Sequence, residues 1–571
     1  MAGVVHYEVY IRKTAPAPWS LLMATEDRKH AIETAEDLLA DDRAAAVRVT
    51  KETLDPDTME FASVTVLTRG APEVQRKRLV SEESRGPTCA GPHDFYAPHA
   101  RELIARALED WLARQGVTAF ELLHRPDLAE ILEASGVELQ HAIQKVAVPE
   151  SQATGQPVHE LIRHYQKLSE QAIERVLAMG RRGKIPDLAE KSLAEVAQKL
   201  SGSADRAFII GAAISQALKG VRGARARVET LMNLLDRAPA EGPPRALVLV
   251  AAEQLLSEIF ASRTNLAQVL GPSLDQGGSL AAVVRMAAPR EIAALIAHDA
   301  RLAIQIPVVD GPAERLGQRL QAGEFPLLAA ALARMVLREL MSPCRLRPTD
   351  AGGEIDILRT LATSLTAAAG RLLTLDEVQN AFIERSKSLV TADFVGAYVR
   401  DCQTVLAEAE ALSRLCENVT GSASKRSAAR WMLACVSSLR FESELRQSSL
   451  SAAQKLLTLA ALQRSTRVAG LSETDESQIA AAIGVVGGVV EAEGRITAQL
   501  ARSPAPAPQK LSALLRLAAG ETAPLGPAAD RAKAEAVRLL RVPDTRAALG
   551  QTPQALGALK TLMQAAGLAA A

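Results

Sequence analysis

The sequence predicts a mainly α-helical protein, in which a multi-block helical array follows a small N-terminal α/β module of the β-α-β-β type. Apolar and polar residues alternate with the period of a strand only before residue 70, and apolar residues recur at helical spacing from residue 98 onward. The composition, with 48% hydrophobic but only 3% aromatic residues, favours closely packed helices over β-sandwich cores. We therefore expect more than half of the chain to be helical and its strands to lie within residues 1–70.

The N-terminal module begins with the stretch VVHYEVYIR, whose alternation and β-branched and aromatic residues are typical of a strand. Only one helix, at residues 26–40, is available to cover the sheet that the expected strands form. An edge or part of one face is then left uncovered, so we expect the module to dock or to self-associate. The expected strands are residues 4–12, 19–23, 46–50 and 61–68, the last two joined by the Asp55-Pro56-Asp57 turn.

The sequence pattern of the helical array is clearest between residues 94 and 148. Apolar residues around Trp111 share one helical stripe, and Gly116 ends that helix. Thr118 and Glu121 have the spacing of a capping box, so the next helix begins there. Helices this short are marginal alone, and we expect them to pack against others.

Proline- and glycine-rich breaks divide the array into blocks, although no repeat of fixed period is detectable. We expect one long helix at residues 205–236 and a stiff, extended spacer at residues 503–508 (SPAPAP). The expected divisions are the module at residues 1–70, a flexible linker at 71–97, helical blocks at 98–237, 245–341 and 354–501, and a Pro/Ala-rich spacer with a C-terminal helical tail at 502–571.

The longest apolar run, residues 480–490 (AAAIGVVGGVV), is too short to span a bilayer. We expect a buried helix whose backbone is closely approached at Gly484, Gly487 and Gly488. The N-terminus lacks the pattern of a secretion signal, and the five cysteines are scattered without a C-x-x-C pair. These features predict a cytoplasmic protein without a membrane span.

Motifs for bound cofactors are missing, and we expect none. Neither phosphate-binding glycine motif occurs, and the His159–His164 spacing places the two rings on different sides of a helix. His298 and Asp299 form the kind of pair that helical metal-dependent hydrolases use, although no histidine follows them. An alternative function is therefore metal-assisted hydrolysis in a helical active site near these two residues.

The total charge argues against a polyanion as the main partner, because 66 basic residues balance 66 acidic ones. The best local anion patch is the basic cluster Lys219, Arg222, Arg225 and Arg227. Its spacing winds around a helix and contains no aromatic residues for base stacking. Nucleic-acid binding through this cluster is a second alternative.

A group of scarce aromatic residues lies beside charge at Phe382, Arg385, Phe394 and Tyr398. Such residues are frequent anchors of protein interfaces, but they also form ordinary contacts between helices, and exposure decides between the two. Stacked amphipathic helices offer large surfaces for proteins or peptides. The function that the sequence favours is a non-catalytic scaffold or regulatory adaptor that binds other proteins through helical surfaces.

Overall fold

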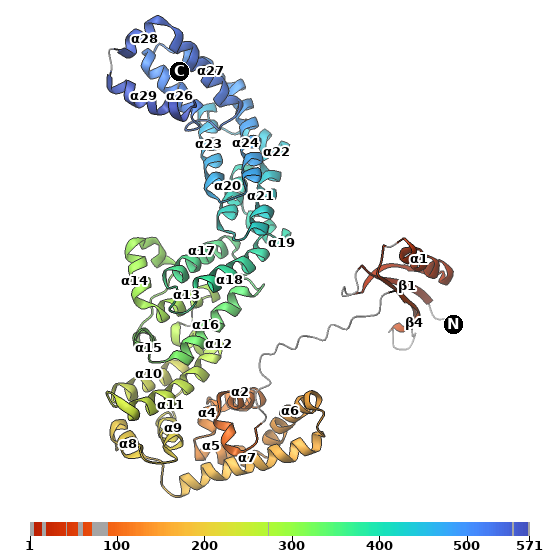
Figure 1. Cartoon of the computed structure of the whole chain (residues 1–571), viewed down its shortest axis with the longest axis vertical. Helices are drawn as coiled ribbons and strands as arrows, with labels where there is room; N and C mark the ends of the chain where they lie inside the picture. The colour runs from red at the N-terminus through yellow and green to blue at the C-terminus, as the bar shows by residue number, and fades with distance from the viewer. Residues whose placement is uncertain are drawn as a thin grey trace. The chain divides into compact units, whose positions relative to one another are not determined.

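The computed structural model describes residues 5–13, 19–41, 43–54, 61–70, 89–271, 273–550 and 553–568. This part contains 29 α-helices and one four-stranded antiparallel sheet, with a helical content of 71% (Figure 1). The chain divides into two compact units, Met1–Ala90 and Gly91–Ala571. All described strands lie before residue 71. The predicted fold class is therefore confirmed.

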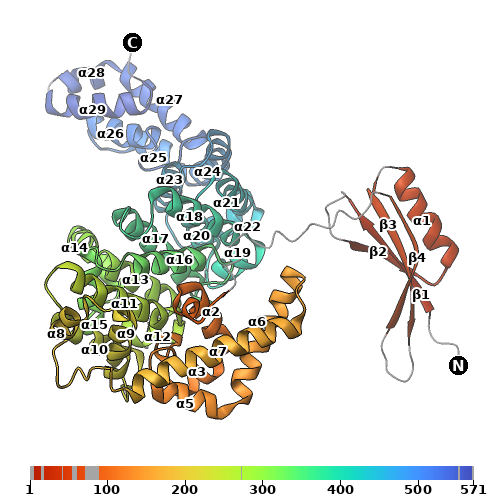
Figure 2. The same ribbon diagram turned by 60° about the horizontal axis from the view of Figure 1, so that its bottom comes forward.

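The first unit is a sheet with the strand order β2-β1-β3-β4 and one helix, α1, packed on it (Figure 2). Val9 of β1 faces Val49 of β3 in the antiparallel register, and both are fully buried beneath Ala31 and Ala35 of α1. Asp27 caps α1 by accepting a hydrogen bond from the Lys29 amide. The elements are β1 (Val5–Arg12), β2 (Ser20–Thr25), α1 (Arg28–Ala40), β3 (Ala46–Leu54) and β4 (Phe61–Gly70). The turn expected at residues 55–57 lies outside the described residues.

The second unit begins with a short 3-10 helix, η1 (Pro92–Tyr96), within the segment expected to be a linker. Phe95 is buried there, and η1 packs on the first and last helices of the group that follows. The expected capping box is present, because Glu121 accepts a hydrogen bond from the Thr118 amide and the Thr118 hydroxyl accepts one from the Glu121 amide. The helices of this group are α2 (Pro98–Ala107), α3 (Glu109–Gln115), α4 (Ala119–Leu122), α5 (Pro126–Ser135), α6 (Val137–Thr154) and α7 (Val158–Arg181).

The next group differs from the expectation of a single helix at residues 205–236. Gly220 and Gly223 have φ angles of +81° and +82°, which break this stretch into two helices. The group comprises α8 (Leu193–Leu200), α9 (Arg206–Ala217), α10 (Ala224–Asp236), α11 (Gly242–Ala261), α12 (Arg263–Leu270), α13 (Gln276–Ala287), α14 (Pro289–His298), the 3-10 helix η2 (Ala300–Ile304), α15 (Gly311–Gln321) and α16 (Pro326–Met341).

The remaining helices also differ from one expectation. Residues 507 and 508, expected in an extended spacer, form the first turn of a helix, in which Pro508 occupies an early position that needs no amide donor. These helices are α17 (Ala351–Ala367), α18 (Leu375–Leu389), α19 (Ala392–Val399), α20 (Val405–Asn418), α21 (Ser422–Val436), α22 (Leu439–Gln447), α23 (Ala452–Val468), α24 (Glu473–Gly494), α25 (Ile496–Arg502), α26 (Ala507–Ala518), α27 (Pro527–Arg541), α28 (Pro543–Gly550) and α29 (Pro553–Ala565).

Helix pairs stack in this last region in two layers. The pairs α17–α18, α20–α21, α23–α24 and α26–α27 each pack together (Figure 1). One layer runs through α17, α20 and α23, and the other through α18, α21, α24 and α27. Successive pairs begin about fifty residues apart, which is the organisation of a helical-repeat protein. The repeat is structural only, because stacking requires an apolar stripe on each helix and not identical residues.

The expected close approach at the glycines of α24 is confirmed. A Cβ atom built at Gly484 would lie 2.5 Å from the Leu525 backbone oxygen, and one at Gly487 would lie 2.3 Å from Pro524 Cγ. A Cβ atom at Gly488 would lie 2.9 Å from Pro527 Cβ. These three glycines therefore allow the segment before α27 to rest directly on the α24 backbone.

Within the described ranges, no single helix is long and apolar enough to cross a bilayer. Helices α15 and α16, which meet at 109°, have the length and composition of a span only when the two are taken together.

Candidate binding sites

The aromatic group singled out in the sequence lies largely in the interior. Phe382, Arg385 and Phe394 are buried, and only Tyr398 is partly exposed. The Phe394 and Tyr398 rings stack with their centroids 6.0 Å apart, and the Arg345 guanidinium lies 5.0 Å from the Phe394 ring. This burial matches the alternative of a contact between helices.

Arg385 forms a buried ion pair that holds the connection between α16 and α17. Its Nη2 atom lies 2.7 Å from Glu354 Oε1, and both side chains are only 1% exposed. Its Nη1 atom donates to the backbone oxygens of Ser342 and Cys344. The other Glu354 oxygen accepts from the Arg347 amide at 2.6 Å. Arg385 therefore serves internal structure.

The basic cluster of residues 219–227 is mostly neutralised by carboxylates. Arg222 is exposed, but each of the other three cations forms an ion pair, and Arg227 is itself buried. A continuous anion-binding patch is therefore not formed by these four side chains. The pairs are Lys219–Asp127 (3.4 Å), Arg225–Asp310 (2.7 Å) and Arg227–Glu121.

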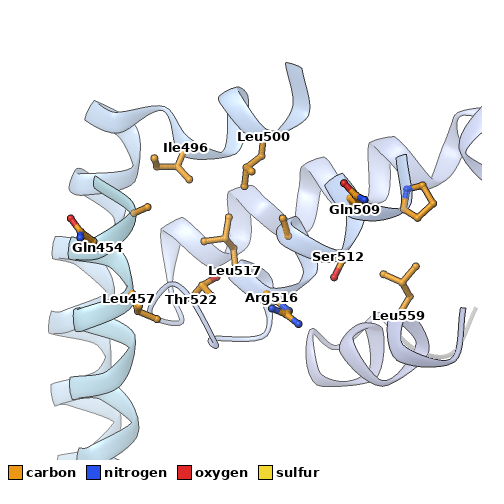
Figure 3. A pocket seen from close by; sticks show the side chains of 13 residues that line it. Gln454, Leu457, Ile496, Leu500, Gln509, Ser512, Arg516, Leu517, Thr522 and Leu559 are labelled. Carbon is orange, nitrogen blue, oxygen red and sulfur yellow. The ribbon is translucent and has the colours of Figure 1, made fainter. Parts of the chain in front are cut away.

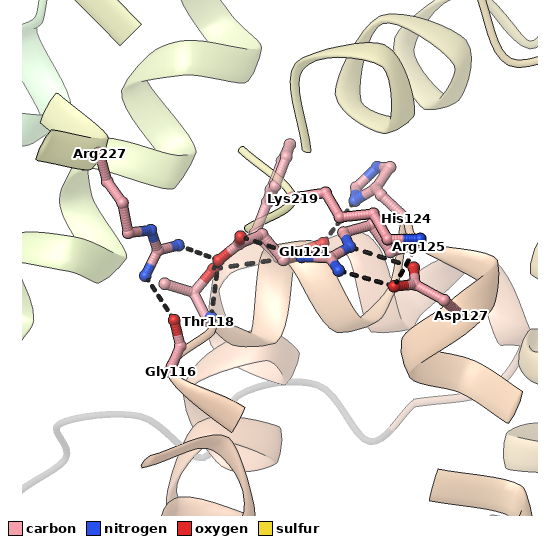
Figure 4. Close-up of polar contacts among 9 residues, drawn as sticks. Gly116, Thr118, Glu121, His124, Arg125, Asp127, Lys219 and Arg227 are labelled. Atoms are coloured by element: carbon pink, nitrogen blue, oxygen red, sulfur yellow. Dashed lines mark hydrogen bonds and ion pairs between the residues drawn. The ribbon is translucent and has the colours of Figure 1, made fainter. Parts of the chain in front are cut away.

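The pair Arg227–Glu121 is the centre of a network that joins α4 to α10 (Figure 4). Arg227 also donates to the Gly116 backbone oxygen at 3.1 Å, and Arg125 lies 3.8 Å from the Glu121 carboxylate. Burial raises the pKa of Glu121, whereas Arg227, Thr118 and Arg125 oppose that shift. The network therefore ties the start of the second unit to the helices that follow it.

A partly open cavity of about 460 Å³ adjoins this network and is lined by residues of η1, α4, α7, α9 and α11. Four rings from Tyr96, Phe120, His124 and Phe208 contact one another edge-to-face or stacked. Arg175 lies 5.3 Å from the Tyr96 ring and 5.0 Å from the Phe208 ring. Because Arg175 also pairs with Asp205 at 3.0 Å and contacts His93 Nδ1 at 2.8 Å, the charged wall of the cavity is internally balanced.

His124 is the titratable group most affected by this site. Its Nδ1 atom lies 2.7 Å from the Phe120 backbone oxygen, and its ring packs against Gly211, where a Cβ atom would lie 2.6 Å from Nε2. Burial lowers the pKa of His124 to about 4, and the charges of Arg101 and Arg175 act in the same direction. The imidazole is therefore neutral at pH 7.

We expect His124 to make the folded chain acid-sensitive. Its folded pKa lies below the unfolded value of about 6.5, so the unfolded state takes up the proton first and stability falls as the pH drops from 6.5 toward 4. The loss between pH 7 and pH 5 is about 2 kcal/mol. Urea unfolding at both pH values should show a smaller pH dependence in His124→Gln than in the wild type. Substitution of the exposed His141 by glutamine should leave the wild-type slope, and an equal slope in both variants would contradict the assignment.

The metal site considered at His298 and Asp299 gains no further ligands from the fold. Asp299 caps η2 and pairs with Arg301 at 3.0 Å, and these interactions with Arg301 lower the pKa of the carboxyl. His298 is exposed at the end of α14. Across the described ranges, no three His, Cys, Asp or Glu side chains gather as a metal site would require, and this includes the neighbourhoods of Cys89, His93 and His99.

An open apolar groove of about 730 Å³ lies near the C-terminus, between α23, α25, α26 and α29 (Figure 3). Five aliphatic side chains form its walls, and Leu457 on α23 is 48% exposed there. Polar side chains such as Gln454, Ser512 and Arg516 also line it. An apolar floor with a polar border is the form of a groove that accepts a helix. The aliphatic residues are Leu457, Ile496, Leu500, Leu517 and Leu559.

Comparison with protein-family models, curated proteins and solved structures finds no match for this chain. The assignment of function therefore depends on the residues described above.

Sequence reasoning missed the groove and the aromatic cavity. The groove joins Leu457 to Leu559, which are about a hundred residues apart, and the cavity joins η1 to α11. One signal was available, because Leu559 and Met563 share a helix face in the tail, and the structure packs both against the core. That signal indicated a buried helix but not the groove beside it.

Proposed function

We propose that this chain is a non-catalytic scaffold or adaptor that binds other proteins through its helical surfaces. The observation that carries the proposal is the open groove, in which Leu457 remains 48% exposed while Leu517 and Leu559 form a buried floor. A partner helix with leucine-type side chains at positions i, i+3 or i+4 and i+7 would bury these walls. The stacked pairs α20–α21, α23–α24 and α26–α27 give the groove a rigid base.

The test uses two substitutions that block the groove and one that does not. Ser512→Trp places an indole at a half-buried lining position, and Leu457→Glu places a charge on the exposed wall. Val468→Glu is the control, because Val468 lies on the same helix, is 76% exposed and is outside the groove. Each full-length variant is first checked by circular dichroism and thermal unfolding against the wild type.

Partners that co-purify with the wild-type chain and the Val468 control should be lost with the blocked variants. Each such partner is then purified, and its affinity is measured directly. We expect each blocking substitution to weaken binding by at least about tenfold, or about 1.4 kcal/mol, because the indole of Ser512→Trp would fill the groove and Leu457→Glu would remove apolar burial from its wall. Equal affinity for blocked and unblocked chains would contradict the groove as the docking site.

A further inference from the structure

The charge of the chain is divided unevenly, although its total is zero. Residues 495–571 contain ten basic and four acidic side chains, a formal charge of +6. The preceding 494 residues contain 56 basic and 62 acidic side chains, a formal charge of −6. Three of the four helices that line the groove, α25, α26 and α29, belong to the basic segment.

One cation of the basic segment lines the groove, and two others follow lining residues closely in sequence. Arg516 lines it, is exposed, and is balanced only by a 3.7 Å contact with exposed Glu521. Arg502 and Lys560 lie two and one residues after the lining residues Leu500 and Leu559, respectively. Both are exposed, and neither has an ion-pair partner among the described residues. The groove is thus lined by one exposed cation, and it lies in the segment that carries the excess positive charge.

We infer that the partner segment of the groove is an acidic amphipathic helix. This inference rests on the proposed function and adds the charge of the ligand to it. The apolar stripe of such a helix would cover the leucine walls, and its carboxylates would be attracted by Arg516 and by the net positive charge of residues 495–571. A polyanion without an apolar face, such as a nucleic acid, would leave the groove unfilled, so the walls favour a helix over a phosphate backbone.

The test uses a phage-displayed library of peptides about 18 residues long, or roughly five helical turns. Leucine is fixed along one helix face, and Glu, Gln or Lys is allowed at every other position. The immobilised target is the full-length chain, and the matched target is the full-length Ser512→Trp/Leu457→Glu chain. Selected peptides are then synthesised, and their affinities are measured by fluorescence anisotropy.

We expect Glu-rich peptides to be enriched on the wild-type chain and not on the blocked chain. Their affinity should fall at least about tenfold in Arg516→Glu/Lys560→Glu, and it should weaken as salt is raised. Arg426→Glu/Arg430→Glu is the control, because it makes the same change of charge on the exposed face of α21 and should leave the affinity nearly unchanged.

The outcomes separate the inference from the proposed function. Enrichment of neutral or Lys-rich peptides that the blocked chain does not bind would contradict the inference that the partner helix is acidic. The proposal that the groove binds a helix would stand. Enrichment of no peptide above the blocked chain would overturn both. Equal effects of the groove and α21 charge substitutions would show that total charge, and not the groove border, attracts the peptide, and would also overturn the inference.

Discussion

Replacing Arg385 by leucine is expected to destabilise the chain by about 3–5 kcal/mol, because the substitution leaves a buried carboxylate without its cation. Glu354 is 1% exposed and would retain only the hydrogen bond from the Arg347 amide. The backbone oxygens of Ser342 and Cys344 would lose their donor at the same time. Thermal and urea unfolding of the full-length chain measure the effect.

The matched substitution is Arg440→Leu. Arg440 pairs with Glu444 one helical turn away at 2.8 Å, but both side chains are well exposed, so the expected loss is below about 1 kcal/mol. In the double variant Arg385→Leu/Glu354→Leu no buried charge remains, and much of the stability should return. If Arg385→Leu and Arg440→Leu have equal effects, the buried ion pair does not hold the α16–α17 connection as described.

Replacing Gly484 by valine is expected to destabilise the chain by about 3 kcal/mol or more, because the new side chain has no room. Its Cβ atom would lie 2.5 Å from the Leu525 backbone oxygen, and a backbone atom cannot rotate out of the way. The segment that leads into α27 would have to move away from α24. Such a shift would also weaken the hydrogen bonds of Gln463 with the Leu525 backbone.

Gly396→Val is the control for the same change of residue. Gly396 lies within α19, and a Cβ atom there would have no atom within 4 Å apart from its chain neighbours and the backbone of its own helix. Valine has a somewhat higher helix propensity than glycine, so this variant should be equal to the wild type or up to about 0.5 kcal/mol more stable. Similar melting temperatures for the two variants would show that α24 and the Leu525 segment do not pack as closely as described.

The class of the fold and many of its local features follow from the sequence alone. Period-two patterning located the strands, helical spacing located the array, and the Thr118 capping box located a helix start that the structure contains. The clustered glycines of α24 predicted a close backbone contact. All of these signals are local, because each depends on residues within a few turns of one another.

Other local signals were misleading because their outcome depended on distant residues. In the sequence, Arg385 lies beside aromatic residues and has the features of an interface anchor. In the structure it is buried, because it pairs with Glu354 and donates hydrogen bonds to two carbonyl oxygens of another segment. The cations of residues 219–227 look like an anion patch, but carboxylates from Glu121, Asp127 and Asp310 neutralise three of them. Ion pairs between residues far apart in the sequence leave no repeating pattern, so sequence analysis does not detect them.

The sequence by itself determined where most of the helical segments lie and how the charge divides between residues 1–494 and 495–571. Only the tertiary structure decided which apolar faces cover one another and which remain open. Leu457 in the exposed wall and Leu559 in the buried floor are both leucines on helices, and their exposure differs because α26 packs against α29 and leaves space beside α23. Burial is a property of the packed chain, since it depends on neighbours that the local sequence does not specify.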